Sequence, residues 1–134
     1  MAVRYAVRLN GARALALTKL DVLDSQEQIP VCVGYRHRKG VLTELPTDLD
    51  QLEAVEPVYE TLPGWQQSTV GILRHKDLPK AARDYVAFLE KQVGSKVALI
   101  STGPRREETI VCPDSPLVGW LGDRLATVLT QRGA

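Results

Sequence analysis

The sequence predicts an α/β fold with a single hydrophobic core. An amphipathic helical pattern over residues 79–94 leads into the apolar run 97–100, which is the order of an αβ unit. Two apolar runs, 14–17 and 97–100, each end in a polar turn, as strands do at the ligand-bearing edge of an α/β sheet. The chain has 134 residues, enough for one domain with such a core.

The chain opens with a predicted helix. Apolar side chains of the first ten residues share one helical face, and Gly11 can end the helix in the left-handed conformation. Because no Ser, Thr, Asp or Asn precedes this helix as a cap, we expect the sequence to begin partway through an element. Residues 14–20 then predict a buried strand that delivers Asp21 to the polar loop 22–28.

Two further strands are predicted to form an antiparallel hairpin. Residues 31–36 and 41–45 have strand patterns, and the turn between them contains Gly40, where a positive φ is expected. Residues 47–55 fit either a short capped helix or an acidic loop.

A proline-rich segment follows at residues 57–65. Two prolines and a glycine restrict its path, while the rings of Tyr59 and Trp65 need burial and partners for their polar atoms. We expect these two anchors to brace a loop near the functional site.

Helix and strand alternate in the second half of the chain. Asp77 or its neighbour is predicted to cap the helix at 79–94, and residues 97–100 and 108–111 are predicted strands. The charged residues at 105–108 are two arginines followed by two glutamates, a pattern typical of a solvated face with salt bridges.

The pattern changes from Pro113 onward. Ser115 followed by a proline predicts the start of a helix, so residues 113–134 form a separate, helical tail. Its amphipathic stripe consists of Leu117, Leu121, Leu125, Val128 and Leu129.

The two polar turns suit recognition of a guanine base. Guanine offers two adjacent donors, N1–H and the N2 amino group, and the Asp21 carboxylate can accept both, whereas adenine has no such pair. If the segment stays extended, Lys19 lies on the same side as Asp21 and its methylene stem can cover the base. The turn at residues 101–104 would offer backbone N–H groups and the Ser101 hydroxyl to the guanine O6.

Composition and missing motifs exclude several function classes. A net charge of +1 and 5% aromatic residues argue against nucleic-acid binding, and no apolar stretch is long enough to span a membrane. Cys32 and Cys112 lie in or beside apolar runs, which favours buried, reduced thiols and a cytoplasmic protein. The chain contains no GxxxxGK[ST] or GxGxxG loop for phosphates and no carboxylate cluster for a metal, so we assign no catalytic or metal-binding residue.

Five strings in order resemble the C-terminal third of the adenylosuccinate synthetases. The similarity covers about residues 3–111, and residues after about 113 depart from that family. The strings are residues 4–10, 15–24, 31–35, 56–65 and 100–104.

The resemblance implies a GTP-dependent ligase of AMP biosynthesis. Such an enzyme joins IMP and L-aspartate, hydrolyses GTP with Mg²⁺, and works as a homodimer built on a larger, mostly parallel sheet of the P-loop NTPase-like type. Carried over by position, the resemblance assigns the GTP base to Lys19, Leu20, Asp21, Ser101, Thr102 and Gly103.

The part of the family that resembles this chain lacks the phosphate loop, the catalytic residues and the Mg²⁺ ligands. We therefore expect residues 1–112 to be the guanine-binding part of such an enzyme, inactive alone. It would be either a truncated product or one half of a split enzyme that an N-terminal half chain completes. The alternative is a non-catalytic interaction module, or a relic, that keeps the fold and pairs with a partner chain.

Overall fold

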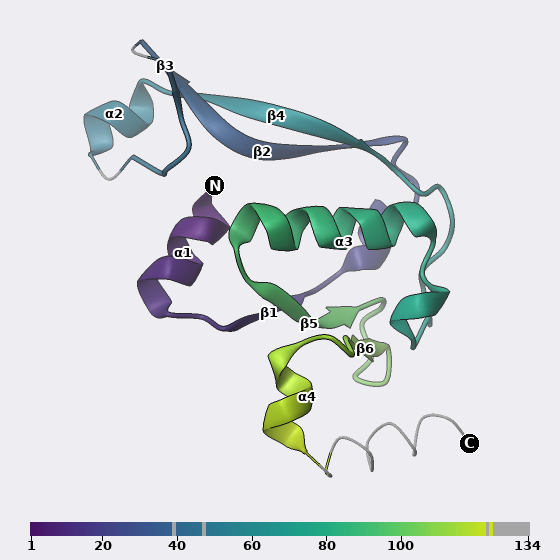
Figure 1. Ribbon diagram of the computed structural model, residues 1–134. Helices are drawn as coiled ribbons and strands as arrows, with labels where there is room; N and C mark the ends of the chain where they lie inside the picture. Colours follow the sequence, from purple (N-terminus) through teal and green to yellow (C-terminus); the bar gives the residue numbers. More distant parts are fainter. Residues whose placement is uncertain (39, 47, 123, 125–134) are drawn as a thin grey trace.

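A computed structural model describes residues 1–38, 40–46, 48–122 and 124 (Figure 1). The α/β class expected from the sequence is confirmed, with two three-stranded sheets and several helices. The elements follow in the order α1 (Ala2–Asn10), β1 (Ala14–Leu17), η1 (Leu20–Leu23), β2 (Gln28–His37), β3 (Gly40–Leu42), α2 (Leu49–Glu53), β4 (Glu56–Pro63), η2 (His75–Asp77), α3 (Lys80–Val93), β5 (Lys96–Ser101), β6 (Thr109–Val111) and α4 (Pro116–Leu121).

The first sheet has the order β1-β5-β6 and is mixed. β5 runs parallel to β1, with Leu17 opposite Ile100, and antiparallel to β6. The predicted αβ unit is confirmed, because α3 leads through Gly94, in the left-handed conformation, directly into β5. In Figure 1, α3 and α4 lie on opposite sides of β5, and both contact that strand.

The second sheet has the order β3-β2-β4 and is antiparallel throughout (Figure 1). The predicted hairpin of β2 and β3 is confirmed. The sequence pattern did not predict a strand within residues 57–65, yet β4 pairs with β2 from Glu56 to Pro63. The prolines near its two ends argued against a strand in the sequence. However, β4 lies at the edge of its sheet, where a proline is tolerated if its missing N–H would not have paired with a neighbouring strand.

The core lies where α3 packs on the first sheet and on the turns that follow β1 and β5. Its central side chains are almost completely buried. They are Leu20, Ile29, Trp65, Leu78, Ala82, Val86, Val97, Ile100, Ile110 and Cys112. Burial of the Cys112 thiol raises its pKa to about 11, as expected for a structural cysteine without reactive character.

The predicted helix boundaries are confirmed in part. α1 ends at Gly11, which adopts the left-handed conformation with φ 59°, and α2 begins at Asp48, whose carboxylate caps it. Asp77, however, pairs with Arg74, the residue before η2, and Pro79 precedes α3 without a side-chain cap. The expected cap of α3 was therefore wrong, because a nearer cation competes for the carboxylate.

The predicted tail helix begins as expected, after Ser115. The Ser115 hydroxyl donates a hydrogen bond to the Cys112 carbonyl (2.8 Å) and does not cap α4. The last three residues of the expected stripe, at 125, 128 and 129, lie outside the described residues. Among the helices that the structure describes, none combines the length and apolar character needed to cross a membrane.

Candidate guanine-binding site

The fold brings the two predicted turns together. β1 and β5 are parallel neighbours, so their carboxyl ends reach the same edge of the sheet. There the Lys19 N–H donates a hydrogen bond to Ser101 Oγ over 2.9 Å, linking residues 82 positions apart. The two turns, far apart in the sequence, are thus neighbours joined by a direct hydrogen bond.

The first turn reverses direction at Lys19. This residue is in the left-handed conformation, with φ 59° and ψ 43°, and its side chain is exposed. The next side chain, Leu20, is 1% exposed and anchors η1 in the core. The segment is therefore not extended, and the assumption that placed Lys19 and Asp21 on the same side is wrong.

Asp21 lies in the first turn of η1 and is half-buried. Its Oδ1 atom is occluded from solvent and has no hydrogen-bond partner among the described residues. An unsatisfied buried polar atom costs about 1–3 kcal/mol, so this carboxylate lowers the free energy of unfolding of the ligand-free protein.

Asp24, one turn later, has the opposite environment. Oδ1 accepts hydrogen bonds from Trp65 Nε1 (2.7 Å) and Thr69 Oγ1 (2.8 Å), and Oδ2 accepts one from the Thr69 N–H (2.6 Å). The expected anchoring role of Trp65 is confirmed, since its ring is buried and its N–H is satisfied. Tyr59 is not an anchor, because it is 57% exposed on β4.

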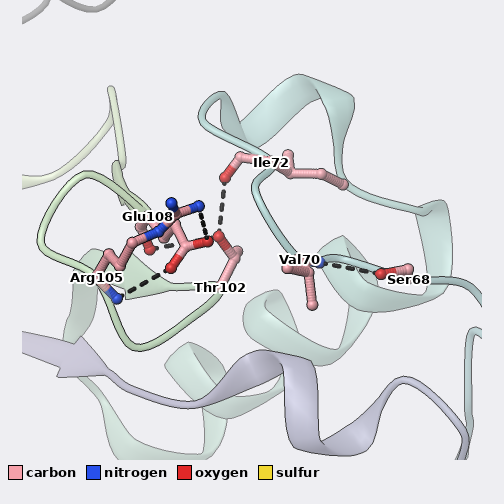
Figure 2. A network of polar contacts seen from close by, with 6 residues as sticks. All are labelled: Ser68, Val70, Ile72, Thr102, Arg105 and Glu108. Atoms are coloured by element: carbon pink, nitrogen blue, oxygen red, sulfur yellow. Dashed lines mark hydrogen bonds and ion pairs between the residues drawn. The ribbon is translucent and has the colours of Figure 1, made fainter.

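The second turn begins where β5 ends. Ser101 Oγ accepts from Lys19 and keeps its own hydrogen to donate. Thr102 is fully buried: its N–H donates to the Glu108 carbonyl (2.9 Å) and its hydroxyl to the Ile72 carbonyl (3.0 Å), as Figure 2 shows for the hydroxyl. Thr102 therefore supports the turn from within, and Gly103 is the next backbone donor after it.

Glu108 supports the same turn from beneath. Its carboxylate accepts the Arg105 N–H and a bond from Arg105 Nη2, both at 3.0 Å (Figure 2). These bonds from Arg105 hold the pKa of Glu108 below its usual value. A Cβ on Gly103 would clash with the Glu108 carboxylate, so any larger residue there would force Glu108 to shift away from Arg105.

The interpretation of residues 105–108 as a solvated charged face is wrong for Glu108. The Arg105 side chain is exposed, but Glu108 is 5% exposed. The sequence signal that could have identified it is its place directly before the apolar strand β6, where an acid needs donors from its own loop.

Comparison with known proteins supports the resemblance carried by these turns. The model of the adenylosuccinate synthetase family matches residues 1–110. The chain belongs to this family. A relative from Chromohalobacter salexigens, named adenylosuccinate synthetase, is 51% identical over 83% of this chain and 26% of its own length. One from Hahella chejuensis, with the same name, is 52% identical over 82% of this chain and 26% of its own.

A solved structure agrees with the family assignment. The fully ligated adenylosuccinate synthetase from Plasmodium falciparum matches with a TM-score of 0.76 and 32% identity, over 81% of this chain and 27% of that one. This chain therefore spans about a quarter of the length of these relatives. In the part of the chain that the structure describes, no three His, Cys, Asp or Glu side chains come together as a metal site.

Proposed function

We propose that this chain is the guanine-recognising part of an adenylosuccinate synthetase that works in the cytoplasm. The complete enzyme would convert IMP, L-aspartate and GTP to adenylosuccinate, GDP and phosphate with Mg²⁺, as a homodimer with a larger, mostly parallel P-loop NTPase-like sheet. Family membership supports this proposal, and because the chain spans about a quarter of its relatives, the whole reaction remains a proposal for it.

One observation carries the assignment to the base. The carboxylate of Asp21, with an unpartnered oxygen, lies in a turn that is hydrogen-bonded to the second turn through Lys19 and Ser101. The N1–H and N2 amino donors of guanine match a carboxylate, and its O6 acceptor matches the Ser101 hydroxyl or the Gly103 N–H. Adenine has no N1–H, and its 6-amino group would face those donors.

In the proposed reaction, these residues act far from the bonds that change. The γ-phosphoryl group passes from GTP to the 6-oxygen of IMP, the aspartate amine then attacks C6, and phosphate leaves with that oxygen. Of the six assigned residues, Lys19, Asp21, Ser101 and Gly103 would contact only the base, while Leu20 and Thr102 anchor the two turns in the core. Their contribution is binding energy that orients the triphosphate for transfer.

The alternative is a non-catalytic module that pairs with a partner chain. Two features favour it: β1 forms an edge of its sheet, and Trp120 of α4 is 55% exposed. A partner carrying the phosphate loop would make the pair a split synthetase. A partner without such a loop would support the module.

Titration of the purified chain with GDP and ADP, followed by NMR, tests base recognition. We expect GDP alone to shift the amides of Lys19 and Ser101, and Asp21→Ala to abolish the shift. Asp84→Asn is the matched control, because Asp84 is an exposed aspartate on α3 paired only with Lys80. Equal shifts with ADP, or an unchanged response of Asp21→Ala, would contradict the assignment.

Activity of the chain alone is a separate test. We expect no adenylosuccinate from IMP, L-aspartate and GTP when the purified chain is the only protein present. Measurable turnover would show that a catalytic site lies within these residues.

A further inference from the structure

Residues 69–72 belong to neither of the two turns proposed to bind the base, but they are hydrogen-bonded to both, through Asp24 and through Thr102. We propose that the turn at residues 69–72 is a bridge that sets the separation of the two turns, with Asp24 and Thr69 as positioning residues for guanine recognition. The inference rests on the proposed function. It concerns residues with no direct role in holding the base.

The first end of the bridge is the Asp24 carboxylate. The Asp24 N–H donates to the Asp21 carbonyl (3.1 Å), so Asp24 moves with η1 and with the carboxylate proposed to bind guanine. Thr69 is fully buried and gives Asp24 two hydrogen bonds, from its N–H (2.6 Å) and its hydroxyl (2.8 Å). Hydrogen bonds to a carboxylate in a buried site are among the stronger ones in proteins.

The span of the bridge is a tight turn. The Ile72 N–H donates to the Thr69 carbonyl (3.1 Å), and Gly71 at the third position has φ 76°, as a type II turn requires. The Ser68 hydroxyl accepts a further bond from the Val70 N–H (3.3 Å; Figure 2). These local bonds restrict the turn to one conformation, so it can transmit a displacement.

The second end of the bridge is the Ile72 carbonyl. It accepts the hydroxyl of Thr102 over 3.0 Å, and Figure 2 shows this bond crossing from the loop around residue 72 to the loop that contains Glu108. Thr102 is fully buried and lies between Ser101 and Gly103, the proposed donors to O6. A shift of Ile72 would therefore displace those donors.

The bridge and the Lys19–Ser101 bond link the two turns at two separate places. The direct bond joins the two turns at the sheet edge, and the bridge joins them through the core side. Recognition of a base by groups on two turns requires their spacing to hold within about half an ångström. A single link at the edge would leave the two turns free to hinge about it.

Two variants break the bridge by different means. Thr69→Val removes the hydroxyl bond to Asp24 while keeping the side-chain shape, and Thr69→Ser should restore it. Gly71→Ala strains the turn at φ 76°, although no atom lies within 4 Å of the added Cβ. Gly94→Ala is the matched control, because Gly94 has φ 75° and equally open space but ends α3, away from the bridge.

The first readout is hydrogen exchange of the Lys19 and Thr102 amides without nucleotide, normalised to the amide of Val86, a buried residue in the middle of α3. We expect both ratios to rise about tenfold in Thr69→Val and Gly71→Ala, because opening of the bridge becomes easier, and to stay unchanged in Gly94→Ala. The second readout is the dissociation constant for GDP, which should rise about fivefold or more in the same two variants.

The outcomes separate this inference from the proposed function. Unchanged exchange at Lys19 and Thr102 in both bridge variants would overturn the bridge. Faster exchange with unchanged GDP affinity would overturn the positioning role. If the unaltered chain does not bind GDP while exchange rises at both turns, the bridge stands as a structural coupling, and the assignment of the turns to guanine and the positioning role both fall.

Discussion

Replacing Asp21 by asparagine should abolish or reverse the preference for guanine over hypoxanthine. The carboxylate can accept both N1–H and the N2 amino group of guanine, whereas hypoxanthine has N1–H but no N2. Asparagine retains one acceptor for N1–H, and its amide NH₂ then faces the N2 amino group of guanine, donor against donor. The same amide meets no opposing donor on hypoxanthine.

The size of the effect follows from one charge-assisted hydrogen bond. Such a bond contributes about 1.5–3 kcal/mol, which corresponds to roughly 10–150-fold in affinity. Asp21 is half-buried rather than enclosed, so solvent weakens the bond and we expect the lower end, about tenfold in favour of GDP over IDP. In Asp21→Asn the ratio should fall to one or below.

The assay is NMR titration of both proteins with GDP and IDP, which share identical phosphates and ribose. The shift of the Lys19 amide localises binding to the site, and Asp84→Asn controls for the loss of one negative charge. A preference for GDP that persists in Asp21→Asn would refute the reasoning, because N2 would then be recognised by another group.

Three further predictions concern stability and ligand range. Asp21→Ala should leave the free energy of unfolding unchanged or raise it by about 1 kcal/mol, since it removes an unpartnered buried oxygen; Asp24→Ala should lower it by about 3 kcal/mol or more, since it leaves Trp65 and Thr69 donors unpaired. Urea unfolding measures both, and equal destabilisation by the two would contradict the assigned environments. The lowered pKa of Glu108 means that its contribution to stability is present above its unfolded pKa, about 4.3, and is lost as the pH falls through the folded value. Glu108→Gln should therefore flatten the loss of stability on acidification, and an unaltered acid profile would count against the role of Arg105. GTP, GDP and guanosine should bind with similar affinity, because the sequence has no phosphate loop; isothermal titration showing a strong preference for GTP would reveal a phosphate site within the chain.

The elements that could be predicted from sequence are those whose signals are local. The periodicity of α3, the glycines that end α1 and α3, and the apolar run of β5 each act within a few residues. The missed strand β4 has prolines near both ends, and its residues pair with residues of β2 that lie 20 to 35 positions earlier, from Arg36↔Glu56 to Gln28↔Pro63, so no local pattern marks it.

The same distinction between local signals and distant contacts explains which parts of the candidate site could be predicted. Residue chemistry at the ends of two apolar runs was enough to propose Asp21 and Ser101 as parts of one pocket, and the fold places their turns together. The conformation of the first turn was not predictable, because nothing local in the sequence marks the left-handed conformation of Lys19, which is not a glycine. Asp24 was missed as a support because its partners, Trp65 and Thr69, lie more than forty residues away in the sequence. Glu108 was missed although its partner Arg105 is only three residues away, because its burial depends on the rest of the fold.

The parallel pairing of β1 with β5 also has a kinetic consequence. The two strands that end in the proposed pocket are separated by some eighty residues. Closing a loop of that length lowers the entropy of the chain before the pairing of the strands stabilises it. The hairpin of β2 and β3, by contrast, closes over a few residues. The pocket should thus be among the last regions to form during refolding, and a guanine nucleotide added to the refolding chain would bind only molecules that have completed the first sheet.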